Sequence, residues 1–284
     1  MNPRLLTALY TFLAMLAFAS NSILNRLALG QESIDAVSYT TVRLISGTFT
    51  LWLITYLQRN RTGSNVRGNW ISAAMLFLYA IAFSFAYLSL SAGTGALILF
   101  GSVQMTMLLV ALRSGERPQA LEWLGIVLAL GGLVYLVLPG LQAPSPLGSV
   151  LMMIAGIAWG MYSLRGRGSS SPLADTTGNF IRTVPLILVV LLLSLNGVQL
   201  SQTGILLAVL SGAVASGLGY VIWYAALAGL SATRAAIVQL SVPVLAAWAG
   251  VVFLAEDLSL RLIVAGALIL GGIALAITRR SKLS

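Results

Sequence analysis

Apolar blocks long enough to cross a membrane recur along the whole chain. About 20 apolar residues cross the hydrocarbon core of a bilayer as a helix, whereas a strand of a membrane β-barrel needs only about ten. Hydrophobic types make up 58% of the 284 residues and charged types only 8%, too few to cover a water-soluble fold of this size. We therefore predict an all-α polytopic membrane protein. Its ten transmembrane helices are expected at residues 5–25, 37–57, 70–90, 94–112, 119–138, 147–165, 177–195, 204–225, 233–254 and 260–278.

The chain contains no Cys and no His. Disulfides, haem, iron–sulfur clusters and most zinc sites are thereby excluded, as is catalysis by histidine. A formal net charge of +9 would suggest a nucleic-acid partner for a soluble protein, but the connections between the spans are too short to hold another domain. We expect no cofactor, no metal and no nucleic acid, and a lipid bilayer as the surrounding partner.

The basic residues fall on one side of the predicted membrane. If the N-terminus is cytoplasmic, the outer connections hold only Arg26 and Arg261, together with four acidic residues. The positive-inside rule then places both termini in the cytoplasm. The inner connections and ends collect Arg4, Arg59, Arg61, Arg67, Arg113, Arg117, Arg165, Arg167, Arg279, Arg280 and Lys282.

The first span also has features of a secretory signal. Arg4, an apolar run and the small residues Ala17 and Ala19 resemble a cleavable leader. The apolar stretch continues past Ala19 to Leu24, however, and cleavage would leave an odd number of spans. We expect this segment to be retained as a membrane helix.

The two halves of the sequence carry the same landmarks in the same order. Turns with Glu116 and Glu256 are each followed by a glycine pair, and the offset between the two copies is 140. The other matches, at nearly the same offset, are Gly131-Gly132 with Gly271-Gly272, Arg43 with Arg182, Phe18-Ala19 with Trp159-Gly160, and more loosely Tyr87 with Tyr224. Residues 1–140 and 141–284 therefore form two five-helix repeats.

Because each repeat has an odd number of spans, the second must enter the membrane from the opposite side. Inverted repeats of this kind are the architecture of alternating-access transporters, whose substrate sites lie near the bilayer midplane between the halves. We predict such a site here, for a small-molecule substrate. The sequence leaves the oligomeric state open, and a monomer is compatible with it.

The repeated features resemble the drug/metabolite transporter superfamily in its ten-helix EamA-type form. They are the aromatic-small pairs, the arginines Arg43 and Arg182, and the Glu turns with their glycine pairs. The resemblance covers essentially the whole chain and implies a bacterial inner-membrane transporter. The length and the aromatic third and eighth spans are more narrowly similar to the YddG-like aromatic amino acid exporters. The superfamily often has a proline in both its fourth and ninth spans. Pro243 fits the ninth, whereas the fourth has Val103-Gln104.

Aromatic side chains are concentrated on the third and eighth spans, which are repeat partners. Their ring faces offer stacking and cation–π contacts to a flat or cationic solute, while helix packing and interfacial anchoring are the alternative roles. The candidates for lining a cavity are Tyr79, Phe83, Tyr87, Tyr220, Trp223 and Tyr224, with Phe100, Trp159 and Tyr162 from the fourth and sixth spans.

Four amides lie within the spans, at Asn21, Gln104, Asn179 and Gln239. Buried amides need hydrogen-bond partners inside the bundle. They either bond the ammonium and carboxylate of a zwitterionic substrate or hold helices together. Both interpretations stay open.

Arg43, Arg182 and Pro243 are the candidates for gating. Each arginine either attracts a carboxylate at one gate or extends to its nearer interface and fixes a helix end. Pro243 breaks a backbone hydrogen bond of the ninth span and would provide a hinge.

No Asp, Glu or His lies in the middle of a predicted span, so the sequence offers no proton relay. We predict a secondary carrier, not an enzyme, that exports aromatic and other neutral amino acids by facilitated diffusion or exchange. Export of lipophilic cationic drugs or other metabolites is the alternative within transport. A membrane-embedded lipid-modifying enzyme would need clustered acids, which the scattered seven acids do not supply, and no polar filter motif suggests a channel.

Overall fold

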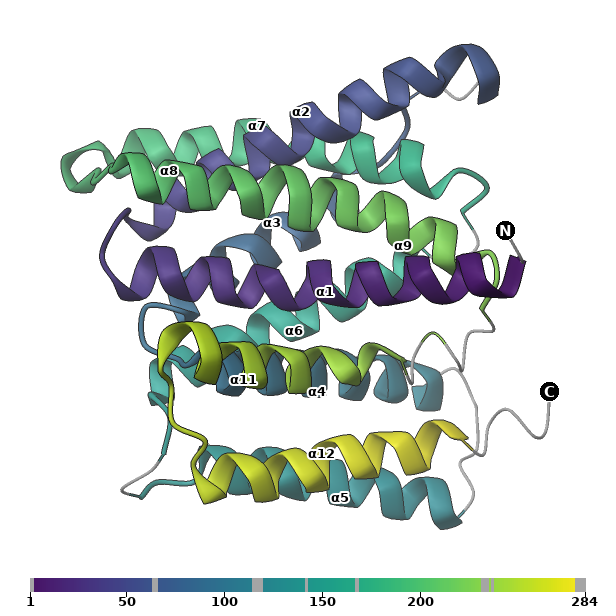
Figure 1. Ribbon diagram of the computed structural model, residues 1–284, viewed down its shortest axis with the longest axis vertical. Coiled ribbons are helices and arrows are strands. Elements are labelled where there is room, and N and C mark those ends of the chain that lie inside the picture. Colours follow the sequence, from purple (N-terminus) through teal and green to yellow (C-terminus); the bar gives the residue numbers. More distant parts are fainter. Residues whose placement is uncertain are drawn as a thin grey trace.

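The computed structural model describes residues 3–62, 66–113, 120–140, 143–166, 169–230, 235 and 238–278. The described chain is helical throughout, apart from its connections and an isolated antiparallel bridge between Ile34 and Leu200. Figure 1 shows the helices lying roughly side by side. The first half contains α1 (Pro3–Gly30), α2 (Ala36–Thr62), α3 (Trp70–Ala86), α4 (Ala92–Arg113) and α5 (Ala120–Val137). The second contains α6 (Pro146–Gly166), α7 (Pro172–Leu193), η1 (Leu195–Gly197), α8 (Gln202–Val209), η2 (Leu210–Leu218), α9 (Gly219–Leu227), α11 (Ser241–Leu254) and α12 (Leu260–Thr278).

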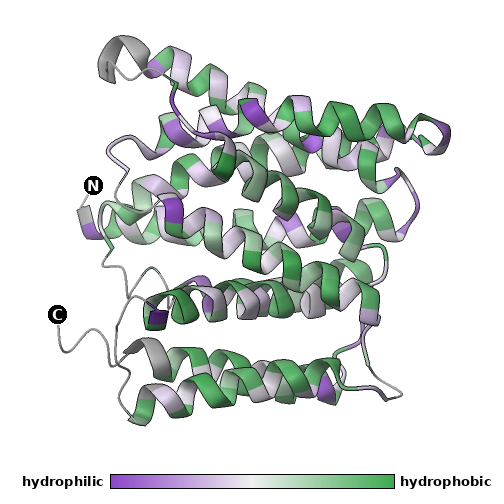
Figure 2. Cartoon of the chain, turned by 180° about the vertical axis from the view of Figure 1, so that it is seen from behind, coloured by the Kyte–Doolittle hydropathy of each residue, from purple (hydrophilic) through white to green (hydrophobic). Residues whose placement is uncertain are grey.

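The helices have the length and surface of membrane spans. Those at Arg4–Gly30, Ala92–Arg113, Pro146–Gly166, Pro172–Leu193 and Gln202–Leu227 are long and apolar enough to cross a bilayer, and shorter apolar helices accompany them. Large apolar side chains such as Phe12, Phe49, Leu193 and Phe253 are exposed on the outside of the bundle. Figure 2 shows apolar residues along the helices and more polar ones in many connections. An outer surface of this kind is stable against lipid rather than water.

The two halves pack in a reciprocal pattern. α1 lies against α9 and α11 of the second half, and α6 lies against α3 and α4 of the first. The pairs α2 with α7, α4 with α11 and α5 with α12 also join corresponding helices. Exchanging the halves therefore leaves these main contacts unchanged, as expected for a duplicated bundle.

The direction of the chain shows that the repeat is inverted. α1 begins and α12 ends at the same end of the bundle, on the right in Figure 1. We call this the terminal end and the opposite one the distal end. Because the chain crosses the bundle five times before α6, α6 runs from the distal to the terminal end, opposite to α1.

The repeated glycine pairs have a packing role that the sequence did not reveal. A Cβ on Gly132 would lie 2.8 Å from Cβ of Leu268, and one on Gly272 would lie 2.6 Å from the Gly125 carbonyl oxygen. The preceding glycines, Gly131 and Gly271, have nothing within 4 Å. The second glycine of each pair thus permits the close approach of α5 and α12.

Several helix ends differ from the predicted spans. α1 continues to Gly30 and so includes Arg26, and α7 begins at Pro172 rather than at 177. Ser171 before Pro172 is a typical helix start that hydropathy alone does not detect. The eighth span is divided by the π-helix η2. There Gly212 lets the backbone approach α2, since a Cβ would meet the Arg43 carbonyl oxygen.

Pro243 does not occupy the middle of a helix. Leu240 interrupts the predicted ninth span, and α11 begins at Ser241, so Pro243 lies in its first turn. A helix needs no backbone donor there, and the expected loss of a mid-helix hydrogen bond is not observed at Pro243. Several predicted features fall outside the described residues or side chains, namely Glu116, Arg59, Arg61, Arg117, Arg167, Arg279, Arg280 and Lys282.

Candidate substrate cavity

A cavity of about 580 Å³ lies between the two halves. It reaches from the middle of the helices to the terminal end, where Arg67, Asn69 and Arg165 at its mouth are exposed. Binding sites for small molecules commonly have volumes of about 300–1,000 Å³. Helices α1, α3 and α4 line it from the first half, and α6, α7, α9, Ala235 and Gln239 line it from the second.

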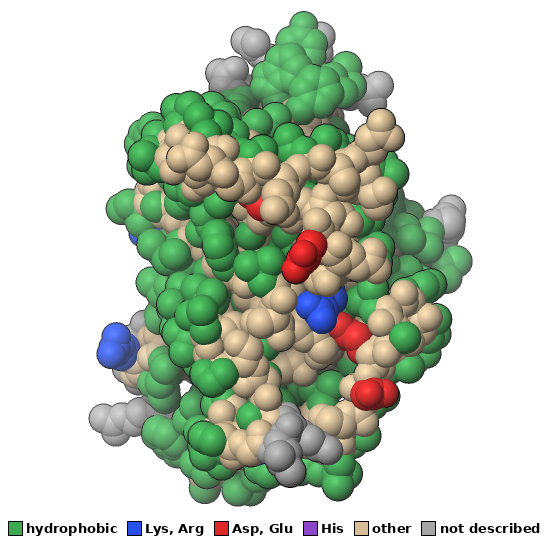
Figure 3. Space-filling view, turned by 90° about the vertical axis from the view of Figure 1, so that its left-hand side faces the viewer, with side chains coloured by type: hydrophobic (Ala, Val, Ile, Leu, Met, Phe, Trp, Pro, Cys, Tyr) green, Lys and Arg blue, Asp and Glu red, His purple; other side chains and the backbone are tan. Residues whose placement is uncertain are grey.

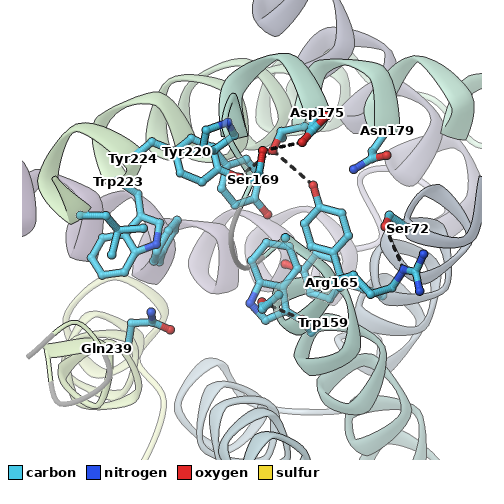
Figure 4. Close-up of a pocket in the computed structure, with 18 of the residues that line it drawn as sticks. Ser72, Trp159, Arg165, Ser169, Asp175, Asn179, Tyr220, Trp223, Tyr224 and Gln239 are labelled. Atoms are coloured by element: carbon cyan, nitrogen blue, oxygen red, sulfur yellow. Dashed lines mark hydrogen bonds between the residues drawn. The ribbon is translucent and has the colours of Figure 1, made fainter. Parts of the chain in front are cut away.

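An aromatic cluster forms the inner part of this cavity. Trp159 of α6 is central, with its ring centroid 4.8 Å from that of Tyr79 and 5.4 Å from that of Tyr220. Phe18 of α1 packs on Tyr220 and Trp223 of α9 at 5.9 Å and 5.8 Å. The rings come from both halves and are held in offset and edge-on contacts that aromatic side chains favour. Figure 4 shows Trp159, Tyr220 and Trp223 around the open space.

All of the predicted lining residues except Tyr87 border the cavity. Those that border it are Asn21, Tyr79, Phe83, Phe100, Gln104, Trp159, Tyr162, Asn179, Tyr220, Trp223, Tyr224 and Gln239. Their location is thus observed, while their contact with a substrate stays a prediction. Tyr87 is instead fully buried next to Gly95, and its hydroxyl lies 3.4 Å from the carbonyl oxygen of Ala92. It packs α3 against the start of α4.

The four amides have different environments. The Asn21 carbonyl oxygen accepts a hydrogen bond from Ser211 at 2.7 Å, and that of Asn179 accepts the backbone N–H of Asn69 at 2.9 Å. These two amides hold segments of the bundle together. The side chains of Gln104 and Gln239 border the cavity, and in Figure 4 the Gln239 amide projects from its helix toward the open space.

Arg43 is buried directly behind the cavity wall. Its side chain is 2% exposed, so it does not extend to an interface. The guanidinium donates a hydrogen bond to the Tyr79 hydroxyl at 3.0 Å and lies 5.4 Å and 5.1 Å from the ring centroids of Tyr79 and Phe83. Its Nη1 atom is buried without a hydrogen-bond partner. A cation buried in a membrane protein without a carboxylate partner is costly and marks a functional position.

Arg182, the repeat counterpart of Arg43, has a different role in the structure. Its Nη1 donates to the carbonyl oxygens of Arg67 and Gly178, both at 2.8 Å, and its guanidinium lies 6.0 Å from the Trp70 ring centroid. Arg182 therefore fixes the connection between α2 and α3 onto α7. The two arginines are equivalent in sequence but not in environment.

The mouth contains an acid, Asp175, that lies just before the predicted seventh span and was not among the predicted site residues. Asp175 lies in the first turn of α7, borders the cavity, and accepts hydrogen bonds from the Gly68 backbone N–H at 3.3 Å and from Ser169. Figure 4 shows Asp175 beside Ser169. Asp35 precedes it by 140 residues, the offset of the repeat, and this match would have identified it.

Basic and hydroxyl groups also lie at the mouth of the cavity. Arg165 donates to Ser72 at 3.2 Å and to Asn69 at 3.3 Å, and Arg67 donates to Ser170 at 3.1 Å. Within the described ranges, no three acidic side chains come together as metal ligands would. The mouth is thus a polar, mainly basic rim below an aromatic interior.

The distal end is held together by contacts between the halves. Glu256 accepts the backbone N–H of Ala92 at 2.8 Å and pairs with Arg26 at 3.3 Å, and burial raises the pKa of Glu256. Glu256 therefore caps the start of α4 in the other half. Asp35 also bonds across the halves, accepting the Gln199 backbone N–H at 2.9 Å. Figure 3, which views this end, shows the few charged side chains among apolar and uncharged ones.

Comparison with known proteins identifies relatives over the whole chain. The model of the EamA-like transporter family matches twice, at residues 5–138 and 146–278. An uncharacterized protein of Pseudomonas aeruginosa is 52% identical over 274 residues, which cover 96% of this chain and 95% of that protein. An uncharacterized transporter of Archaeoglobus fulgidus is 27% identical over 209 residues, covering 72% and 74% of the two chains. The crystal structure of another protein has a TM-score of 0.69 with this chain, at 20% identity over 98% of each chain, and so has the same fold.

Proposed function

The chain belongs to the EamA-like transporter family and is thus a membrane transporter rather than an enzyme, and we propose that it exports aromatic and other neutral amino acids by alternating access. The observation that carries this proposal is the aromatic cavity between the halves, open at one end. A space of about 580 Å³ with stacked rings and amides suits a compact, partly flat solute that also has polar groups.

The distribution of charges supports export as the direction of transport. Arg4, Arg67, Arg113 and Arg165 lie at the terminal end, whereas Glu32, Asp35, Glu256 and Asp257 lie at the distal end with Arg26 and Arg261. By the positive-inside rule, the terminal end faces the cytoplasm of a bacterial inner membrane. The cavity then opens to the cytoplasm, which is the state that loads a solute for export.

The residues of the cavity divide into two proposed roles. Trp159, Tyr79 and Tyr220 stack against the apolar part of the solute, and Gln104 and Gln239 bond its polar groups. Arg43, Arg182 and Pro243 are proposed to act when the halves rearrange. The two arginines anchor α2 and α7, and Pro243 lies in the first turn of α11, just after the helix is interrupted at Leu240. The 1–140 and 141–284 halves are the moving units of this proposal.

Transport is proposed to follow the gradient of the solute itself. Asp175 is the acid that borders the cavity in the described chain, and both of its oxygens are already bonded within the mouth. A free carboxylate at the midplane, as a proton carrier would need, is not found among the described side chains. Uptake into proteoliposomes that required an imposed pH gradient would contradict this part of the proposal.

Export of lipophilic cations is the second candidate, because an aromatic wall with Asp175 at its mouth also suits a cation. The deciding experiment is counterflow in proteoliposomes with labelled phenylalanine, tryptophan and leucine and with one cationic dye. We expect the amino acids to exchange and the dye neither to move nor to compete. Movement of the dye with no movement of any amino acid would replace the first candidate by the second.

A further inference from the structure

We propose that Arg43 and Tyr79 together form the subsite that receives an anionic carboxylate of the substrate, with Tyr79 making the contact and Arg43 acting through it as a positioning residue. This inference rests on the proposed function, since it assigns a substrate class to the same cavity. It concerns the hydroxyl of Tyr79, a residue that borders the cavity, and the Arg43 cation to which this hydroxyl is bonded.

The direction of the hydrogen bond between these residues is fixed by their chemistry. A guanidinium has only donors, so the bond of 3.0 Å from Arg43 to Tyr79 must be accepted by the Tyr79 oxygen. The hydroxyl hydrogen of Tyr79 therefore points elsewhere. Within the described chain it has no acceptor, and Tyr79 borders the cavity. Tyr79 thus presents a donor to whatever occupies the cavity.

The positive charge of Arg43 favours an anionic acceptor for the Tyr79 hydroxyl hydrogen. Arg43 is 2% exposed, its Nη1 has no partner, and its guanidinium contacts the rings of Tyr79 and Phe83 rather than a carboxylate. The ion pair found among the described side chains is that of Arg26 with Glu256, which leaves Arg43 without an acidic partner. A buried, unpaired cation attracts an anion and repels a cation.

The neighbouring rings fit a substrate held in this way. Tyr79 contacts Trp159 at a centroid distance of 4.8 Å, and Trp159 stacks on Tyr220 at 5.4 Å. An acceptor bound at the Tyr79 hydroxyl would therefore lie beside a surface that binds an apolar group. The subsite favours monocarboxylates with an apolar or aromatic side chain over lipophilic cations of the same size.

The first test measures binding to purified wild-type protein through the fluorescence of its tryptophans. The probes are L-phenylalanine, L-tryptophan and L-leucine, each compared with its carboxamide, which has nearly the same shape but no anionic group. A hydrogen bond to a charged group corresponds to about tenfold to a hundredfold in affinity. We expect each acid that binds to do so at least about tenfold more tightly than its amide. If no acid binds more tightly than its amide, the inference is wrong.

Single substitutions test whether Tyr79 causes the preference for the acid over its amide. Tyr79→Phe removes the donor but keeps the ring, and we expect it to reduce the acid-to-amide affinity ratio about tenfold while leaving binding of the amide unchanged. Tyr56→Phe is the control, because Tyr56 is 58% exposed on the outside of the bundle and does not border the cavity. We expect it to leave the ratio unchanged.

Arg43→Gln should also reduce the ratio, and the double variant with Tyr79→Phe should be no worse than either single variant. Additive effects would mean that the two residues act separately and would overturn the inference. If Arg43→Gln does not fold, the comparison of Tyr79→Phe with Tyr56→Phe alone decides. An unchanged ratio in Tyr79→Phe would then refute the inference.

Counterflow separates this inference from the proposed function. If acids and amides are transported equally well, the carrier function stands and the carboxylate subsite is wrong. If acids bind in a manner that depends on Tyr79 but no solute crosses the membrane, the subsite stands and the transport of amino acids is wrong.

Discussion

Arg26 and Glu256 form an ion pair of 3.3 Å that joins α1 of the first half to the connection between α11 and α12 of the second. Glu256 also accepts the backbone N–H of Ala92 at the start of α4, so one carboxylate connects three segments. This junction lies at the distal end, opposite to the mouth of the cavity. Alternating access would require contacts of this kind to open when the cavity opens to the other side.

We expect Glu256→Gln to weaken the distal junction. The native chain has no cysteine, so a single Ser22→Cys substitution provides a label site in the cavity wall. In this background, Glu256→Gln should increase labelling by a membrane-impermeant maleimide added outside intact cells several-fold. Asp257→Asn is the control, because this neighbouring acid is exposed. Equal labelling of the two variants would show that the ion pair does not close the distal end.

Asp35 should make the stability of the protein depend on pH. Burial tends to raise its pKa, but hydrogen bonds from Ser38, Gln199 and Val37 outweigh burial, so that the pKa of Asp35 is lowered. A carboxyl whose pKa is lower in the folded state stabilises the fold above its unfolded pKa of about 3.9, and this contribution is lost as the pH falls through the folded value. Stability should therefore decline in acid.

Asp35→Asn should reduce this decline. The amide cannot accept the Gln199 backbone N–H where the second carboxylate oxygen did, so we also expect a loss of about 1–2 kcal/mol in the free energy of unfolding at pH 7. Thermal unfolding in detergent from pH 7 to 2 measures both effects. A variant with the wild-type stability and the wild-type acid slope would contradict this prediction, and Asp257→Asn again serves as the control.

Trp159→Ala should reduce transport at least tenfold without reducing the amount of protein in the membrane. The substitution removes the ring that contacts Tyr79, Tyr162 and Tyr220 at the centre of the cavity. Trp248→Ala is the matched control, since Trp248 is 61% exposed on the outside of the bundle. Counterflow rates normalised to protein abundance provide the comparison. Equal rates for both variants would assign Trp159 to packing.

Substitution by alanine should change the stability of the protein differently at the two adjacent glycines of α12. At Gly272 a Cβ would lie 2.6 Å from the Gly125 carbonyl oxygen and 2.7 Å from the Ala129 nitrogen, backbone atoms that cannot move independently. We expect Gly272→Ala to destabilise the protein by about 1–3 kcal/mol. Gly271→Ala has open space and should be neutral or slightly stabilising. Thermal unfolding of the two variants checks this, and equal melting temperatures would exclude a close contact of α5 and α12.

The sequence by itself determined the class of fold and its duplication. Long apolar blocks have few alternatives to membrane helices, and an odd number of spans in each repeat forces an inverted second half. It also pointed to Tyr79, Trp159 and Tyr220 as candidates for lining the cavity, because large aromatic side chains within a span are conspicuous against aliphatic neighbours. These inferences depend only on composition and order along the chain.

Only the tertiary structure decided what each polar or aromatic residue contacts. It buried Tyr87 against α4 and left Tyr79 in the cavity, and it placed Arg43 behind the wall but Arg182 on the connection between α2 and α3. It also assigned Glu256 to the start of α4 in the other half. In a membrane, the faces of a helix that meet lipid and those that meet other helices are both apolar. Hydropathy therefore does not specify how a span is rotated, and packing between the halves does.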